Sequence, residues 1–294
     1  MKKNADQIRR IGLIGNSEKS SRADVLRRAA QLIQRAGRKV FCDVETARLA
    51  RLKVPTFADA ATLAREVDLL LVFGGDGTML HVARAIAGSS TPMLGVNIGG
   101  LGFLTGVPSD ELAGALKCVW NGEFRYESRA LIETSGRCNG KKIVESALND
   151  IVVSRGAVSR LISLDVSVDG ELITRYRCDG LIISSPTGST AYSLSAGGAV
   201  VLPTAEVFAM TPICPHALSN RSIILPLSSK IRVKAISPLP STILSVDGQF
   251  VGELDAGDEV IIRRSRRTIR LVHLADNSFL EALRRKLQWR GTYL

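Results

Sequence analysis

The first 121 residues alternate short apolar runs with amphipathic stretches. Two stretches carry apolar residues at helical spacing, Ala23–Ala36, which Gly37 ends, and Thr78–Ala87, and Ser109 is a candidate N-cap for a helix reaching Asn121. The predicted strands are Ile11–Ile14, Lys39–Val44, Leu69–Phe73 and Met93–Val96. This alternation predicts an open, Rossmann-like α/β domain over residues 1–123 with a mostly parallel sheet.

After residue 123 the pattern changes to alternating β-branched runs. The predicted strands are Ile143–Ser154, Ile162–Val168, Leu172–Cys178, Leu181–Ser184, Ser222–Leu225, Ile231–Lys234, Ile243–Val246, Val260–Arg263 and Thr268–Leu274. Three turn pairs punctuate them, Asn139-Gly140, Asp169-Gly170 and Asp247-Gly248. Residues 124–276 are therefore predicted to form an antiparallel, β-sandwich-like domain.

The chain closes with an amphipathic stretch at Ser278–Leu287, which is predicted to be a helix. Its apolar side carries Phe279, Leu280, Leu283 and Leu287. Because such a face must be covered, residues 277–294 are expected to pack back on the first domain.

The amino-acid composition excludes several classes of protein for this chain. Of 294 residues, 45% are hydrophobic and 23% are charged, as in globular chains. Neither a signal peptide nor an apolar run long enough to span a bilayer is evident, so no membrane partner is expected. Five scattered cysteines without a C-x-x-C pair, and three dispersed histidines, argue against disulfides and zinc and favour a cytoplasmic location.

A net charge of +11 favours polyanionic partners, and phosphate-rich small molecules qualify as well as nucleic acid. The densest basic run is Arg263-Arg264-Ser265-Arg266-Arg267, which has no interleaved aromatic residues. We interpret it as a solvated hairpin, and no nucleic-acid partner is predicted.

The segment Gly74-Gly75-Asp76-Gly77-Thr78 follows the most apolar predicted strand and opens a predicted helix. Ligands bind at such strand ends, where glycine backbone and a helix N-terminus favour phosphate. An acid among these glycines would repel phosphate unless it accepts a proton from a hydroxyl nucleophile or shares a metal ion with the phosphates. A helix-capping role for Asp76 is an equal alternative on the local pattern.

Three further segments are rich in glycine or polar residues. Gly95–Thr105 follows the next strand, and by itself fits an ordinary connection. The loop Thr187–Gly198 combines hydroxyls, glycines and Tyr192, which favours nucleotide contact over a plain polar turn. Asn149 and Asp150 are adjacent inside an apolar run, where one must face the buried side and needs a partner, unless they form a bulge.

In their order and spacing along the chain, these four segments resemble those of the bacterial NAD kinases, which use ATP and sometimes polyphosphate. The series continues with Pro215-His216-Ala217-Leu218-Ser219-Asn220-Arg221 and Asp247-Gly248-Gln249, so the resemblance covers about residues 11–289. The resemblance implies phosphoryl transfer from ATP to the 2′-hydroxyl of the adenosine ribose of NAD, with a divalent cation such as Mg²⁺. It also implies a homodimer or homotetramer, and a site in the cleft between the two domains.

Residue roles follow from the same resemblance. Asp76 would be the general base and Gly77 would let the ligand approach the backbone, while Asn149 and Asp150 would hold the NAD ribose. Asp179 would contact the nicotinamide amide. The remaining nucleotide-binding residues would be Arg160, Arg177, Thr190, Ala191, Tyr192, Ser193, Leu194, Ser195 and Gln249, and the metal ligands are not assigned.

One residue departs from the family's pattern. The family usually has Glu where this chain has Asp150, so the carboxylate is one methylene shorter and the role of Asp150 is open. A lipid or sugar kinase sharing only the Gly-Gly-Asp-Gly turn is the alternative enzyme, and would leave Thr187–Gly198 without a task. A nucleic-acid-binding or nucleotide-sensing protein is the alternative outside enzymes.

Overall fold

The structure is a computed structural model that describes residues 7–15, 21–100, 102–157, 160–217, 219–236, 242–274 and 278–289. The chain divides into two compact units. Unit 1 comprises Met1–Ser128 with Ile269–Leu294, and unit 2 comprises Arg129–Thr268. The domain boundaries predicted from sequence stay predictions, and the one at 276/277 lies outside the described residues.

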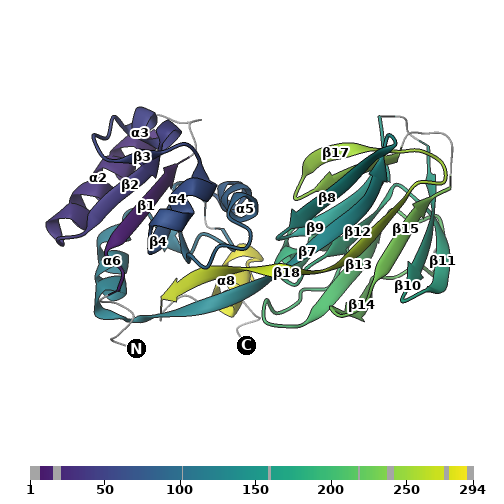
Figure 1. Ribbon diagram of the computed structural model, residues 1–294. Coiled ribbons are helices and arrows are strands. Elements are labelled where there is room, and N and C mark those ends of the chain that lie inside the picture. The colour runs from purple at the N-terminus through teal and green to yellow at the C-terminus, as the bar shows by residue number, and fades with distance from the viewer. Residues whose placement is uncertain are drawn as a thin grey trace, which may run out of the picture. The chain divides into compact units, whose positions relative to one another are not determined.

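Unit 1 is a parallel sheet flanked by helices (Figure 1). Its sheet order is β18-β5-β4-β1-β2-β3, and β6 pairs with β5. The strands are β1 (Arg10–Gly15), β2 (Lys39–Asp43), β3 (Thr56–Phe57), β4 (Leu69–Gly74), β5 (Met93–Asn97), β6 (Val107–Pro108) and the end of β18 (Glu259–Leu274). The helices are α2 (Ser21–Arg35), α3 (Val44–Ala50), α4 (Ala60–Glu66), α5 (Asp76–Ala85), α6 (Leu112–Asn121) and α8 (Phe279–Lys286).

Burial explains why β4 is apolar throughout. All six of its residues are buried, because α2 and α6 cover one face of the sheet while α4 and α5 lie on the other. The predicted parallel α/β domain is confirmed, and so is the closing helix, since Phe279 of α8 contacts Phe103 of the same unit.

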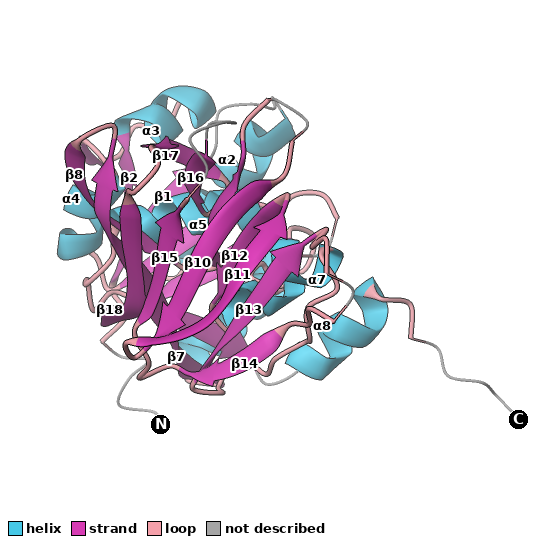
Figure 2. Ribbon diagram, turned by 90° about the vertical axis from the view of Figure 1, so that its right-hand side faces the viewer, coloured by secondary structure: helices cyan, strands magenta, loops and turns pink. Residues whose placement is uncertain are grey.

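Unit 2 contains two antiparallel sheets, whose strands are seen in Figure 2. One has the order β11-β10-β15-β18-β7-β8 and the other β14-β13-β12-β9-β16-β17, and their inner residues share one hydrophobic core. The first sheet contains β7 (Phe124–Cys138), β8 (Lys141–Ala147), β10 (Ile162–Val168), β11 (Glu171–Cys178), β15 (Ile231–Ala235) and β18. The second contains β9 (Asp150–Arg155), β12 (Gly180–Ser184), β13 (Val207–Ile213), β14 (Ile223–Pro226), β16 (Thr242–Val246) and β17 (Gln249–Leu254).

The three predicted turns are confirmed. In Asn139-Gly140, Asp169-Gly170 and Asp247-Gly248 both residues have positive φ, as tight hairpin turns require. Among the described residues, no helix has the length and apolar character of a membrane span.

Several local predictions were wrong. The basic run 263–267 is not a hairpin, because β18 continues through it and Arg263 and Arg264 pair with Glu133 and Glu206. Helix α6 begins after Glu111 rather than Ser109. The run 143–154 breaks into β8 and β9, and Leu280 is 61% exposed although it was placed on the apolar face of α8.

Strands β7, β13 and β17 were missed. Charged residues occupy many exposed positions of β7, so its sequence lacks a clean β-branched run, and its partners β18 and β8 define it instead.

Candidate functional site

Asp76 lies at the point where buried strand β4 ends and helix α5 begins. Gly75 is the N-cap residue of α5 and makes no side-chain capping bond, and Asp76 is the first helical residue. The Asp76 carboxylate therefore does not cap its helix, which removes the alternative left open by the sequence. Its position at the carboxyl edge of a parallel sheet is where α/β folds bind ligands.

A neighbouring loop holds the Asp76 carboxylate. The backbone N–H of Phe103 donates to Oδ2 at 2.8 Å, and that of Leu104 donates to Oδ1 at 3.0 Å. The Thr105 hydroxyl lies 3.4 Å from Oδ1, and Lys286 Nζ of α8 lies 3.9 Å from Oδ2. Both oxygens are thus fixed from one side, which is how a catalytic carboxylate keeps its orientation.

Glycines create the space around Asp76. A Cβ at Gly102 would overlap the Asp76 carboxylate and the Thr105 hydroxyl, and one at Gly74 would overlap the Thr78 side chain. By contrast, a Cβ at Gly75 or Gly77 would meet nothing within 4 Å. The turn is therefore tightly packed behind Asp76 and open beside it, and Leu101 of the same loop lies outside the described residues.

In unit 2, the side chain of Asp247 organises the polar pair predicted from sequence. Asp247 is the first residue of the β16–β17 turn, and its carboxylate accepts N–H groups of Leu148, Asn149 and Asp150 at 2.9, 2.7 and 3.2 Å. These three bonds explain why the extended run breaks between β8 and β9.

Asp150 is the buried member of the pair, with 5% of its surface exposed. Desolvation, and then the nearby Asp247 carboxylate, raise the pKa of Asp150 to about 7. Perturbed acids of this kind cluster at functional sites, although structural networks produce them too. Asp150 can therefore hold a proton near neutral pH and act as a hydrogen-bond donor.

The hydroxyl-rich loop folds against the Asn149 backbone. Ser185 N–H donates to Asn149 O at 2.8 Å, and a Cβ at Gly188 would overlap that same carbonyl. Ser193 is fully buried, and its hydroxyl lies 3.1 Å from that of Thr211. Tyr192, at the start of the short helix α7 (Tyr192–Ser195), is 47% exposed.

The predicted residues of unit 2 fall into two groups at opposite ends of β12. Ser184 of β12 pairs with Asp150, and Val246 pairs with Ile151, so Asn149, Asp150, the loop Thr190–Ser195 and Gln249 belong to one end. Asp179 precedes the other end, where Arg155 Nε donates to its Oδ1 at 2.8 Å.

Two predicted arginines lie on the segments that lead to this end. Arg177 is two residues before Asp179, and Arg160 precedes β10, whose first residue Ile162 pairs with Cys178. The backbone carbonyl of Arg177 accepts the His216 N–H at 2.8 Å, and the side chain of Arg177 is exposed, as is Arg160 in the segment after β9. The sequence did not indicate the Arg155–Asp179 ion pair or this separation into two groups.

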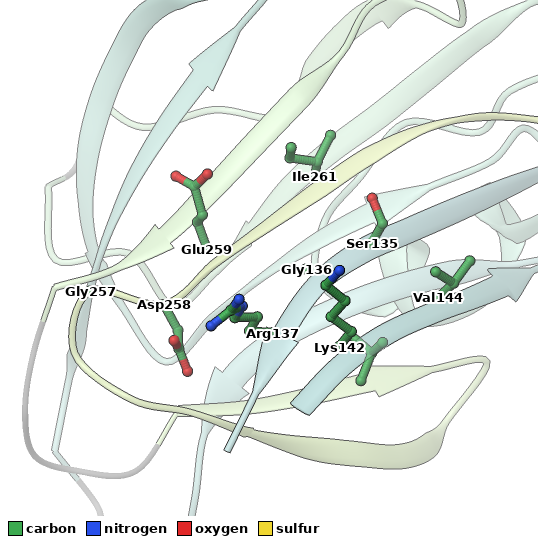
Figure 3. Close-up of a pocket in the computed structure, with 10 residues that line it drawn as sticks. Ser135, Gly136, Arg137, Lys142, Val144, Gly257, Asp258, Glu259 and Ile261 are labelled. Carbon is green, nitrogen blue, oxygen red and sulfur yellow. The ribbon is translucent and has the colours of Figure 1, made fainter. Parts of the chain in front are cut away.

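A pocket of about 430 Å³ in unit 2 lies elsewhere (Figure 3). It is formed by β7, β8 and the start of β18, and its lining residues are Ser135, Gly136, Arg137, Lys142, Ile143, Val144, Gly257, Asp258, Glu259 and Ile261. None of these was predicted as a site residue, so this pocket does not bring the predicted residues together.

Comparison with known protein families covers both units. Residues 11–124 match the ATP-NAD kinase N-terminal domain, and residues 148–274 match the ATP-NAD kinase C-terminal domain. The chain belongs to the NAD kinase family. The resemblance predicted from the ordered motifs is therefore confirmed.

Individual NAD kinases and solved structures support the same family membership. The NAD kinase of Moorella thermoacetica is 40% identical over 285 residues, covering 97% of this chain and 91% of that protein. That of Geobacter sulfurreducens is 44% identical, covering 76% and 78%. Yeast NADH kinase complexed with NADH superposes with a TM-score of 0.89 at 30% identity, covering 98% and 90%, and the Archaeoglobus fulgidus NAD kinase in complex with ATP with 0.74 at 25%, covering 96% and 100%.

For this NAD kinase, sequence reasoning missed the groups that hold the predicted acids. Gly102 and the N–H groups of Phe103 and Leu104 lie in a segment that was recognised only as glycine-rich. Asp247 was recognised as a turn residue, but its three bonds to the segment 148–150 cross about a hundred residues. Nothing in the basic end of α8 singles out Lys286 as the neighbour of Asp76.

Proposed function

We propose that the chain transfers the terminal phosphoryl group of ATP to the 2′-hydroxyl of the adenosine ribose of NAD, giving NADP, with Asp76 as general base. One observation carries this proposal. The Asp76 carboxylate is held by the N–H groups of Phe103 and Leu104 at a sheet edge, beside glycines that leave the adjoining space open.

The chemistry suits such an acid. A ribose hydroxyl is a poor nucleophile, and a positioned base is worth roughly 10²–10⁴-fold in rate. Asp76 takes the hydroxyl proton as the 2′-oxygen attacks phosphorus, and the bond from phosphorus to ADP breaks. Positioning and neutralisation of charge supply the rest of the acceleration.

Unit 2 would hold the acceptor. We propose that Asn149 and Asp150 bind the ribose and that Thr190, Ala191, Tyr192, Leu194 and Ser195 line the dinucleotide site, with Gln249 nearby. The Ser193 hydroxyl is buried against Thr211, so Ser193 would contact the dinucleotide with its backbone atoms. Arg160, Arg177 and Asp179, which also belong to unit 2, would bind the nicotinamide part of NAD.

A divalent cation would accompany ATP. Within the part of the chain that the structure describes, there is no group of three or more His, Cys, Asp or Glu that could hold a metal. Mg²⁺ commonly takes most of its ligands from phosphates and water, so the nucleotide would supply them here. The steps assigned to Asp76 do not depend on the position of the ion.

We also propose a cytoplasmic homodimer or homotetramer. The thiols support a reducing compartment, because all five cysteines are free. Light scattering coupled to size-exclusion chromatography measures the oligomer directly.

The test of the activity is incubation of pure protein with ATP, NAD and MgCl₂, followed by enzymatic detection of NADP. Parallel reactions with NADH and with polyphosphate decide the acceptor and the donor. Absence of NADP from the reactions with NAD, and of NADPH from those with NADH, would reject the proposal.

A further inference from the structure

The closing helix brings a cation to the catalytic turn of unit 1. Lys286, the last residue of α8, places Nζ 3.9 Å from Asp76 Oδ2 and 4.7 Å from the centroid of the Phe103 ring. Phe279, the first residue of the same helix, packs against Phe103 with centroids 6.1 Å apart. Two contacts with one loop residue thus fix the helix and direct its last side chain toward Asp76.

The distance leaves the ammonium available to another group. At 3.9 Å, Lys286 Nζ is too far from Oδ2 for a hydrogen bond, while the N–H groups of Phe103 and Leu104 already hold the carboxylate. The Lys286 side chain is 30% exposed, so a ligand beside Asp76 can reach it. Its neighbour Arg285 is instead paired with Glu281 along the helix at 2.6 Å.

Phosphoryl transfer needs positive charge at this place. The transferring group carries negative charge on three oxygens, and the Asp76 carboxylate beside it is repulsive. A fixed cation aimed at developing charge is among the strongest catalytic effects that a protein supplies. We propose that Lys286 is a catalytic residue whose ammonium binds the phosphoryl group as it passes from ATP to the ribose, an inference that rests on the proposed function.

The roles of the two side chains are complementary. Asp76 accepts the 2′-hydroxyl proton, the phosphorus–oxygen bond to ADP breaks as the bond to the 2′-oxygen forms, and Lys286 remains protonated throughout. The Lys286 ammonium itself lies over the Phe103 ring, so Lys286→Met removes that cation–π contact together with the charge beside Asp76, while it keeps an unbranched side chain of similar length.

The first experiment measures kcat, KM and NAD affinity of Lys286→Met and Lys286→Arg beside the wild type. We expect Lys286→Met to lose roughly 10²–10³-fold in kcat, as when one transition-state donor is removed, with the Kd for NAD and the thermal midpoint little changed. Lys286→Arg should recover part of the rate. Arg284→Met, which removes an equal charge from the same exposed helix end, is the matched control and should keep near-wild-type kcat.

The second experiment separates charge from structure. Lys286→Ala should regain activity when methylammonium is added, whereas Arg284→Ala should not respond. Wild-type kcat in Lys286→Met, while the wild type makes NADP, would overturn the role of Lys286 and leave the proposed function standing. An inactive, unfolded Lys286→Met together with a folded Lys286→Ala that methylammonium fails to restore would also overturn it. No NADP from the wild type would reject both.

Discussion

Asp76 of unit 1 and Asp150 of unit 2 are both acids of the proposed site, and their surroundings are opposite in character. Asp76 faces two backbone N–H groups and the ammonium of Lys286, and its side chain is partly exposed. Asp150 is buried, and the nearby carboxylate of Asp247 repels its charged form. One residue type is therefore placed in an electropositive setting in unit 1 and in an electronegative, desolvated setting in unit 2.

The difference shows how a fold assigns roles to identical side chains. A carboxylate must be charged to accept a proton, and the groups around Asp76 suit that form. A carboxyl group whose pKa is raised to about 7 carries a proton that it can donate to a ribose oxygen or another acceptor. Four variants test this contrast, beginning with the largest expected effect.

Asp76→Asn removes the proposed base while keeping the shape of the side chain. We expect kcat to fall by roughly 10²–10⁴-fold with little change in the Kd for NAD, because a general base acts on the reaction and not on ground-state binding. Steady-state kinetics and calorimetry measure the two quantities. Asp110→Asn, an exposed acid of the same unit, is the control, and comparable turnover in both variants would reject the assignment.

Gly102→Ala leaves every charge in place and disturbs only geometry. The new Cβ would overlap the Asp76 carboxylate and the Thr105 hydroxyl, so the carboxylate must move. We expect a loss of about 10–10²-fold in kcat, since small misplacements of a catalytic group are costly. Gly114→Ala in α6, where a Cβ meets nothing within 4 Å, should remain fully active; equal rates for both would show that the orientation of Asp76 does not matter.

Asp150→Asn tests the buried acid through the dependence of stability on pH. The pKa of Asp150 rises from 3.8 to about 7 on folding, so the folded state holds a proton that the unfolded chain releases above pH 4. The contribution of protonated Asp150 to the free energy of unfolding is fully present below about pH 4. It is lost as the pH rises through the folded-state pKa of about 7, because the buried carboxyl group must then ionise.

The neutral amide should escape that decline. We expect the thermal midpoint of Asp150→Asn, relative to wild type, to rise between pH 5 and pH 8, by about 2–4 °C for each kcal/mol recovered. Calorimetric scans at both pH values measure it. The opposite result is a difference in thermal midpoint between variant and wild type that is the same at both pH values, as expected for the control Asp110→Asn. That result would mean that Asp150 is ionised like an ordinary surface acid.

Asp179→Asn should have the smallest effect. Its pair with Arg155 is about one-third exposed, so its loss should cost only about 0.2–1 kcal/mol of stability. If Asp179 contacts the acceptor, KM for NAD should rise several-fold. The exposed pair of Asp165 and Arg175 provides the control Asp165→Asn; the same KM in both variants would place Asp179 outside the NAD site.

The sequence by itself determined the local features. The apolar run at Leu69–Phe73 and the glycines after it fixed a buried strand that leads into an anion-binding turn. Asp-Gly and Asn-Gly pairs fixed the hairpin turns, because few residues tolerate positive φ. The ordered motifs also indicated the family, since each needs its own residue types at close spacing.

Only the tertiary structure decided what surrounds the two acids. Two residues far away in the chain supply the charges beside these acids. Lys286 places a positive charge beside Asp76, and Asp247 places a negative charge beside Asp150. The same holds for β18, whose basic run is polar enough to suggest a turn but continues as one extended strand that pairs with β15, β7 and β5 along its length. Burial, electrostatic environment and strand pairing depend on contacts between distant segments, and periodicity in a single stretch of sequence does not record them.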